Sequence, residues 1–236
     1  MSDSTSIALV TGGNRGIGLA IASALKAAGH RVVITYRSGT PPTGFEAVQM
    51  DVTDAESVDA AFAKIEAEIG QPEIIVANAG ITKDGLFMWM TPEDWSKVIN
   101  TSLNGFFNVT NFFIQKMLRN KYGRIVNMVS VSGVKGTPGQ TNYSAAKAGM
   151  HGFSMALAQE LATKGVTVNR RSPGYIGTDM VKAIRPDVLE KIVATVPVKR
   201  LGEPSEIASI IAWLASEEGG YATGADFSVN GGLHMG

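Results

Sequence analysis

Short apolar runs rich in β-branched residues alternate along the whole chain with segments of helical character. The runs at residues 7–11, 31–36, 47–50, 74–77, 124–129, 166–169 and 227–229 predict strands, and residues 18–28, 55–69, 104–118 and 144–163 predict helices. Strands that are apolar on both faces and separated by helices indicate a parallel sheet covered on both sides. Right-handed crossovers then give a doubly wound, Rossmann-type α/β sheet. No linker or repeat interrupts the pattern, so we expect a single domain over residues 1–236.

The composition narrows the classes of function. Hydrophobic residues make up 44% of the chain and charged residues 18%, which is ordinary for a globular domain. The 21 basic and 21 acidic residues balance without a block of either sign, so the basic footprint of a nucleic-acid-binding protein is missing. No apolar stretch approaches the ~20 residues that span a bilayer, so we expect no membrane association.

Cysteine and histidine restrict the chemistry further. The chain has no cysteine, which removes disulfides and thiolate catalysis and fits a cytoplasmic location. Its three histidines, His30, His151 and His234, show no metal-ligand spacing, so no metal site is expected. There is also no GxSxG serine of the hydrolase type.

The segment TGGNRGIG at residues 11–18 lies between the first predicted strand and the first predicted helix. Its glycines allow a tight turn and a close approach to a pyrophosphate, which binds the amides at the start of the helix. A glycine cluster alone is weak, because turns also need glycine. Its place inside a βαβ unit favours nucleotide binding. The expected contacts come from Gly12, Asn14, Arg15, Gly16, Ile17 and Gly18.

The end of the second predicted strand distinguishes the two nicotinamide cofactors. Sites that prefer NAD usually place an acid there to bind the ribose 2′-hydroxyl, whereas an arginine accommodates the 2′-phosphate of NADP. This chain has Arg37 at that place and Arg15 in the preceding loop. We therefore expect NADP(H), with the alternative that Arg37 is a solvated strand end.

Tyr143 and Lys147 are four residues apart in a predicted helix, so their side chains share a face. A tyrosine hydroxyl has a pKa near 10 and is a poor acid–base group at neutral pH. A neighbouring ammonium, together with a positive nicotinamide ring, would stabilise the phenolate. The spacing is common by chance, and it gains its value from its position after the fifth strand and downstream of the nucleotide loop.

The combined pattern resembles the short-chain dehydrogenase/reductases over nearly the whole chain. The resemblance implies that Ser130 hydrogen-bonds the substrate oxygen, that Tyr143 donates the proton, and that Lys147 holds the nicotinamide ribose and lowers the tyrosine pKa. Ser132 is an alternative to Ser130, but the thirteen-residue distance to Tyr143 selects Ser130. Further cofactor contacts are implied for Asp51, Val52, Asn78, Ala79, Gly80, Pro173, Gly174, Ile176 and Thr178. For Asn78, a turn residue is the plain alternative.

Two places depart from the family pattern. The family normally has an asparagine in the helix before the fifth strand, where it helps to hold a water that links the lysine to solvent. This chain has Ser102 there, and its shorter reach predicts a weaker proton relay. Arg170 and Arg171 stand at the end of the sixth strand, where relatives have small or apolar residues. A buried unpaired cation costs several kcal/mol. Both arginines should therefore reach solvent or an acid, unless the sequence was altered deliberately.

Within the family, the opening third, including residues 34–45, resembles 3-oxoacyl-[acyl-carrier-protein] reductases, and the part from Gly139 onward resembles acetoacetyl-CoA reductases. This resemblance to two groups in different parts of the chain is compatible with a natural intermediate, a reconstructed sequence or a chimera. Both groups reduce 3-oxoacyl thioesters to (R)-3-hydroxyacyl thioesters with NADPH. We expect residues of about 178–200 to form the substrate lid, and the acyl thioester to be carried on CoA or on acyl carrier protein. Lys121 and Lys164 match basic positions of the carrier-protein enzymes, with ordinary surface lysines as the alternative.

Three further interpretations remain open at this point. The same machinery serves dehydrogenases of other alcohols and ketones, and a non-catalytic NADP-binding module shares the fold. Relatives are usually homotetramers joined through the long helices after the fourth and fifth strands. Four phenylalanines lie in the first of these helices: Phe106, Phe107, Phe112 and Phe113. An aromatic stripe of this kind belongs more often to a core than to an interface.

Overall fold

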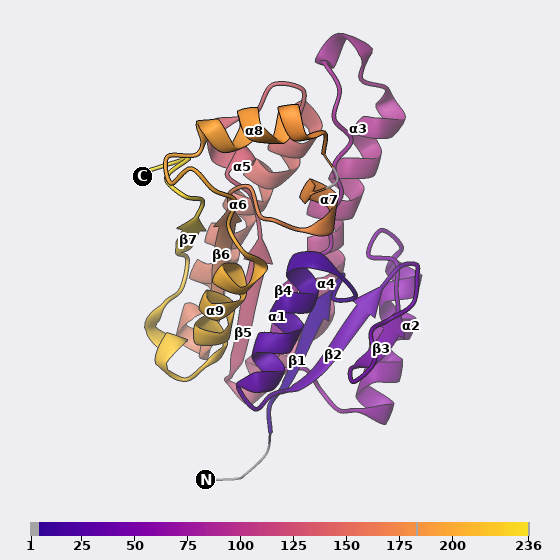
Figure 1. Ribbon diagram of the computed structural model, residues 1–236. Helices are drawn as coiled ribbons and strands as arrows, with labels where there is room; N and C mark the ends of the chain where they lie inside the picture. Colours follow the sequence, from indigo (N-terminus) through magenta and orange to yellow (C-terminus); the bar gives the residue numbers. More distant parts are fainter. Residues whose placement is uncertain (1–4, 183, 236) are drawn as a thin grey trace.

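The computed structural model describes residues 5–182 and 184–235, and in this part of the chain seven parallel strands form one sheet. The order across the sheet is β3-β2-β1-β4-β5-β6-β7 (Figure 1). The strands are β1 (Ile7–Thr11), β2 (Arg31–Tyr36), β3 (Glu46–Gln49), β4 (Ile74–Ala77), β5 (Gly123–Met128), β6 (Val166–Pro173) and β7 (Asp226–Val229). The expected doubly wound α/β fold is confirmed.

Helices cover both faces of this sheet. α1 (Gly16–Ala27) and α9 (Pro204–Ala215) pack on one face with a core that includes Ile21 and Ile211. α2 (Ala55–Glu68), α4 (Gly105–Asn120) and α6 (Thr141–Leu161) pack on the other. Phe106 and Phe113 of α4 are buried in this second core, whereas Phe107 is 50% exposed. The aromatic residues of α4 therefore serve mainly as core, as their spacing favours.

Shorter elements gather at the carboxyl end of the strands. They are η1 (Phe87–Trp89), α3 (Pro92–Ile99), the π-helical turn η2 (Asn100–Asn104), α5 (Ser132–Lys135), α7 (Asp179–Lys182) and α8 (Pro186–Thr195). The 3₁₀ turns η3 (Ala162–Lys164) and η4 (Glu218–Tyr221) lie outside this group. In Figure 1 the carboxyl ends of the strands point to the upper end of the molecule, where α7 and α8 lie (orange). Ligands of such sheets bind at this end.

The order of the strands defines where a ligand should bind. β1 pairs with β2 on one side and with β4 on the other, because the chain runs outward from β1 through β2 to β3 and then crosses back to β4. In open α/β sheets this topological switch point creates the ligand crevice. The segment after β1 is the glycine loop, and the segment after β4 begins with Asn78.

The main difference from the predicted elements concerns the sixth strand. The prediction covers residues 166–169, but β6 continues to Pro173, because β5 pairs with Arg170 and Arg171 and β7 pairs with residues 170–173. Arg170 and Arg171 therefore lie inside the sheet. Helices α3, α8 and α9 were not among the predicted helices, and α6 begins at Thr141, three residues earlier than expected. Residues 1–4, 183 and 236 of the expected domain lie outside the described residues.

Candidate active site

The glycine loop has the geometry of a phosphate-binding turn. Gly12 and Gly16 have φ values of 63° and 54°, a region that favours glycine. At Gly18 a Cβ atom would lie 2.3 Å from the backbone oxygen of Gly12, so only glycine fits. Within the described chain, no side chain caps the start of α1 at Arg15. The first amides of this helix are therefore available to an anion, as a pyrophosphate requires.

Asn78 joins the segments after β1 and β4. Its side-chain amide donates to the backbone oxygens of Thr11 at 3.0 Å and Gly12 at 3.2 Å. The Thr11 hydroxyl in turn accepts from the backbone amides of Asn78 and Ala79. Asn78 is thus more than an ordinary turn residue, because it fixes the floor of the crevice at the switch point.

The far end of the crevice carries Arg37, Asp51 and Val52. Arg37 is exposed and follows β2, close to Asn14, whose side-chain amide donates to the backbone oxygen of Ser38 at 3.3 Å. Burial raises the pKa of Asp51, but hydrogen bonds from Thr53 and the charge of Arg37 outweigh it and leave this pKa below its usual value. The Arg37 cation is therefore near Asp51 and free to meet an anionic group of a ligand, as a 2′-phosphate requires.

The segment after β6 approaches the crevice from the other side. The backbone amide of Val131 donates to the oxygen of Pro173 at 3.2 Å, which joins the ends of β5 and β6. Thr178 reaches the glycine loop, since its Cγ2 lies 3.5 Å from the Cβ position of Gly16. Ile176 is only 4% exposed and belongs to the core under α9, so its side chain is not available to a cofactor.

Ser130, Tyr143 and Lys147 converge at the carboxyl end of β5. Ser130 comes two residues after this strand, and Tyr143 and Lys147 lie in the first two turns of α6. The Lys147 ammonium donates to the backbone oxygen of Met128 at 2.7 Å and lies 5.5 Å from the centre of the Tyr143 ring. Its Nζ is also 3.6 Å from the Cβ position of Gly80. The catalytic candidates and the cofactor candidates after β4 thus share one crevice.

The electrostatics of this group are dominated by burial. Burial lowers the pKa of Lys147 to about 8. Burial also raises the pKa of Tyr143, and the Asp84 carboxylate adds to this rise, whereas a hydrogen bond with Ser130 opposes it. The expected lowering of the Tyr143 pKa by Lys147 together with a nicotinamide ring therefore stays a prediction, and burial of both groups opposes it.

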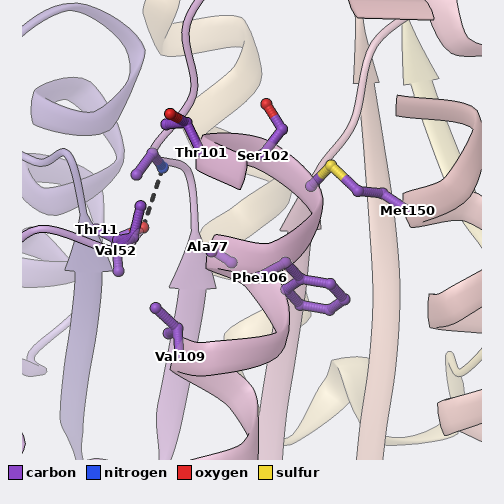
Figure 2. Close-up of a pocket in the computed structure, with 10 residues that line it drawn as sticks. Thr11, Val52, Ala77, Thr101, Ser102, Phe106, Val109 and Met150 are labelled. Carbon is purple, nitrogen blue, oxygen red and sulfur yellow. Dashed lines mark hydrogen bonds between the residues drawn. The ribbon is translucent and has the colours of Figure 1, made fainter. Parts of the chain in front are cut away.

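Ser102 lies in the π-helical turn η2, a type of turn that is frequent at functional sites. It is 1% exposed, and its hydroxyl has no hydrogen-bond partner within the described chain. The residue borders a cavity of about 10 Å³, room for about one water molecule. Figure 2 shows Ser102 one turn above Phe106, with Met150 of α6 on the other side. The Ser102 hydroxyl lies 3.7 Å from the Cβ position of Gly80, which places it near Lys147.

Arg170 and Arg171 are buried on opposite faces of β6, at 8% and 0% exposure. Arg170 donates to the backbone oxygens of His151 at 3.1 Å and Gly224 at 3.0 Å. Arg171 donates to the backbone oxygen of Phe227, and its Nε and second Nη have no partner among residues 5–182 and 184–235. Burial lowers the pKa of both arginines, and the carboxylate of Asp226, which lies opposite Arg170 on β7, opposes this effect. An acid is therefore close to both cations, as expected, although their hydrogen bonds go to backbone carbonyls.

Sequence reasoning missed Asn142 as a residue that builds the site. It is fully buried beside Tyr143, and its side-chain amide donates to the backbone oxygens of Lys83 at 3.0 Å and Asp94 at 3.3 Å. These bonds hold the loop after β4 against the start of α6. A polar residue next to the tyrosine was the available signal, but its partners are about fifty residues away in the sequence.

Comparison with known proteins adds the family. The family model described as enoyl-(acyl carrier protein) reductase matches residues 12–234. The chain belongs to the short-chain dehydrogenase/reductase family. Among its relatives in this family, acetoacetyl-CoA reductase of Cupriavidus necator is 57% identical over 98% of both chains. Acetoacetyl-CoA reductase of Shinella zoogloeoides is 52% identical over 96% of this chain and 97% of its own. The 3-oxoacyl-[acyl-carrier-protein] reductase MabA of Mycobacterium tuberculosis is 46% identical over 97% of this chain and 92% of its own.

The predicted membership of the short-chain dehydrogenase/reductase family is thereby confirmed, and with it the assignment as an oxidoreductase that binds a nicotinamide cofactor. In the described part of the chain, no helix is both long enough and apolar enough to cross a membrane. Residues 5–182 and 184–235 also contain no cluster of three histidine or acidic side chains arranged to hold a metal ion.

Proposed function

We propose that this short-chain dehydrogenase/reductase reduces 3-oxoacyl thioesters to (R)-3-hydroxyacyl thioesters with NADPH. The observation that carries the proposal is the convergence of Ser130, Tyr143 and Lys147 in the crevice of the glycine loop. The names of the relatives supply the substrate class, because two name acetoacetyl-CoA and one a 3-oxoacyl group on carrier protein. The exposed Arg37, in place of an acid, favours NADPH over NADH.

The residues divide the work of the reaction. The glycine loop, Asn78, Ala79 and Gly80 would hold the cofactor along the crevice, and NADPH when bound supplies a hydride. Ser130 hydrogen-bonds the 3-oxo group and orients it. Tyr143 donates a proton to the same oxygen as negative charge develops on it, which is general acid catalysis. Lys147 binds the nicotinamide ribose, and Ser102 assists in returning a proton through a water beside Lys147.

The preference for CoA or acyl carrier protein depends on residues outside the catalytic group Ser130, Tyr143 and Lys147. We place the lid at residues 178–200, where α7 and α8 stand at the carboxyl end of the sheet; residue 183 lies outside the described residues (Figure 1). Its resemblance to acetoacetyl-CoA reductases makes acetoacetyl-CoA the first substrate to test. Lys121 and Lys164 are exposed together near the amino ends of β5 and β6, the end opposite Tyr143. Because of this distance, the two lysines could bind an acyl carrier protein only if its acyl group enters the active site of a neighbouring subunit.

A homotetramer is part of this proposal. α4 and α6 present Phe107 and Met155, which are 50% and 45% exposed, and large exposed apolar side chains of this kind are suited to a subunit interface. The proposed substrates and cofactor are intracellular metabolites, which supports a cytoplasmic location.

The deciding experiment compares kcat/KM for acetoacetyl-CoA and for the same acyl group on acyl carrier protein, with NADPH in both cases. Turnover of both thioesters is expected, with the CoA form preferred, and the product should be the (R)-3-hydroxyacyl thioester. Turnover of simple alcohols or sugars without turnover of either thioester would overturn the proposal.

A further inference from the structure

A chain of hydrogen bonds runs outward from Ser130. The backbone amide of Ser132 donates to the Ser130 hydroxyl oxygen at 3.2 Å. The Ser132 hydroxyl donates to Gln140 Oε1 at 3.1 Å, and Gln140 Nε2 donates to the Asp84 carboxylate at 3.0 Å. The Thr137 hydroxyl also donates to the Ser132 oxygen, at 3.0 Å. Residues 130–140 are thereby tied to one another and to Asp84 of the loop after β4, beside the candidate catalytic serine.

The negative charge of Asp84 determines which group donates in each of these hydrogen bonds. An ionised carboxylate only accepts hydrogen bonds, so Asp84 must receive the amide NH₂ of Gln140. The amide oxygen then faces Ser132 and accepts the hydrogen of its hydroxyl. The Ser132 oxygen is left to accept from Thr137. Because Ser130 accepts from the Ser132 backbone, its own hydrogen remains available for the hydrogen bond with Tyr143.

The link between Ser132 and Gln140 is the buried part of this chain. Ser132 is 8% exposed and begins α5, a helix of one turn, Ser132–Lys135. This turn packs tightly on α6, since a Cβ atom at Gly133 would lie 2.9 Å from Lys147. A single turn is not stable in isolation, so its orientation depends on tertiary contacts. Gln140, the residue directly before α6, provides one of these contacts through its hydrogen bond with Ser132.

We propose that Gln140 is a positioning residue for Ser130, acting through Ser132. The inference rests on the proposed role of Ser130 in orienting the 3-oxo group. Gln140 fixes the first turn of α5, and this turn presents the backbone amide that holds the Ser130 oxygen. The link to Asp84 is exposed and therefore contributes mainly by orienting the Gln140 amide.

Substitutions at Gln140 and Ser132 test the proposed role of these hydrogen bonds. Gln140→Leu and Ser132→Ala are each expected to lower kcat for acetoacetyl-CoA about tenfold or more, with the KM for NADPH and the Tm unchanged. The double variant should be no slower than the worse single variant, because residues that act as one unit are not additive. Gln140→Glu keeps an acceptor for Ser132 but places a second carboxylate against Asp84, so it should regain most of kcat only when it is combined with Asp84→Asn, which supplies the missing donor. Gln159→Leu, a polar position farther along α6, is the matched control.

A readout without turnover separates this inference from the proposed function. Hydrogen exchange at the amides of residues 132–136 is expected to become faster in Gln140→Leu and to stay unchanged in Gln159→Leu. Unchanged exchange, or additive losses of kcat in the double variant, would overturn the positioning role. A wild-type protein that reduces neither thioester would overturn the proposed function, while the exchange result would still decide whether Gln140 orders the turn.

Discussion

The two halves of the sheet bring their ligands into place by different means. In β1 and β2 the buried residues are apolar apart from Thr11 and Thr35, and the crevice above them is lined by backbone atoms of the glycine loop. In β5 and β6 many buried residues are polar or charged, and their side chains hydrogen-bond to other segments of the protein: Arg124, Asn127, Asn169, Arg170, Arg171 and Ser172. The glycine loop of the cofactor half is therefore specified largely by its own sequence, although Asn78 ties it to the segment after β4, whereas the catalytic half depends more widely on partners distant in sequence.

Loss of the proposed general acid, Tyr143, should separate the two halves by the largest effect. Tyr143→Phe removes the proton donor of the catalytic half and leaves the glycine loop intact. We expect kcat to fall by roughly 10²–10⁴-fold, the range for general acid catalysis, with NADPH affinity retained. Steady-state rates and fluorescence titration of NADPH check both halves. Tyr122→Phe, at the opposite end of the sheet, is the control and should be nearly silent. Retained turnover in Tyr143→Phe would contradict the role given to the tyrosine.

Reversal of charge in the cofactor half should act on binding alone. Arg37→Asp removes the cation expected to meet the 2′-phosphate and introduces an acid suited to a ribose hydroxyl. We expect the ratio of NADPH to NADH affinity to fall about 100-fold, equivalent to about 3 kcal/mol. Arg31→Ala, at the other end of β2, should leave this ratio unchanged. Equal losses for both cofactors in Arg37→Asp would argue against NADP(H) as the preferred cofactor.

The two adjacent arginines of β6 should respond oppositely to removal of charge. Burial lowers the pKa of Arg171 to about 10, below its value in the unfolded chain. The buried charge therefore lowers the free energy of unfolding at neutral pH, and this destabilisation is relieved only as the pH rises through 10. Arg171→Met is expected to stabilise the fold by about 1–4 kcal/mol. Arg170→Met loses two bonds to backbone carbonyls and should destabilise it. Denaturant unfolding of the two variants tests this, and a stability loss in Arg171→Met would show that its cation is well compensated.

The smallest expected effect is at Ser102. Ser102→Asn supplies a longer side chain with more hydrogen-bonding atoms beside the small cavity and Lys147. We expect kcat to rise a few-fold with no change in the KM for NADPH. Asn104→Ser, two residues away and exposed, is the matched control. An unchanged or lower kcat in Ser102→Asn would show that serine already suffices for the relay.

The same contrast explains what the sequence could predict. The glycine loop, the order of strands and helices, and Tyr143 with Lys147 follow local patterns, and the fold they predict is the one observed. The length of β6 was missed because arginine is not a typical buried strand residue, and pairing with both β5 and β7 extends the strand through the two arginines. The roles of Asn142 and Gln140 arise from partners in other segments, at Lys83, Asp94 and Asp84, which no local pattern reveals.

Helix α8 has a thermodynamic consequence. None of its ten residues is buried against the described chain, although Val188, Leu189, Ile192 and Val193 lie along it. If this helix closes over the thioester as a lid, the surface of these side chains that is still exposed leaves water when substrate is bound. Burial of apolar surface lowers the heat capacity of the system. Calorimetry of acetoacetyl-CoA binding at several temperatures should therefore give an enthalpy that becomes more favourable on warming, a record of lid closure that needs no turnover.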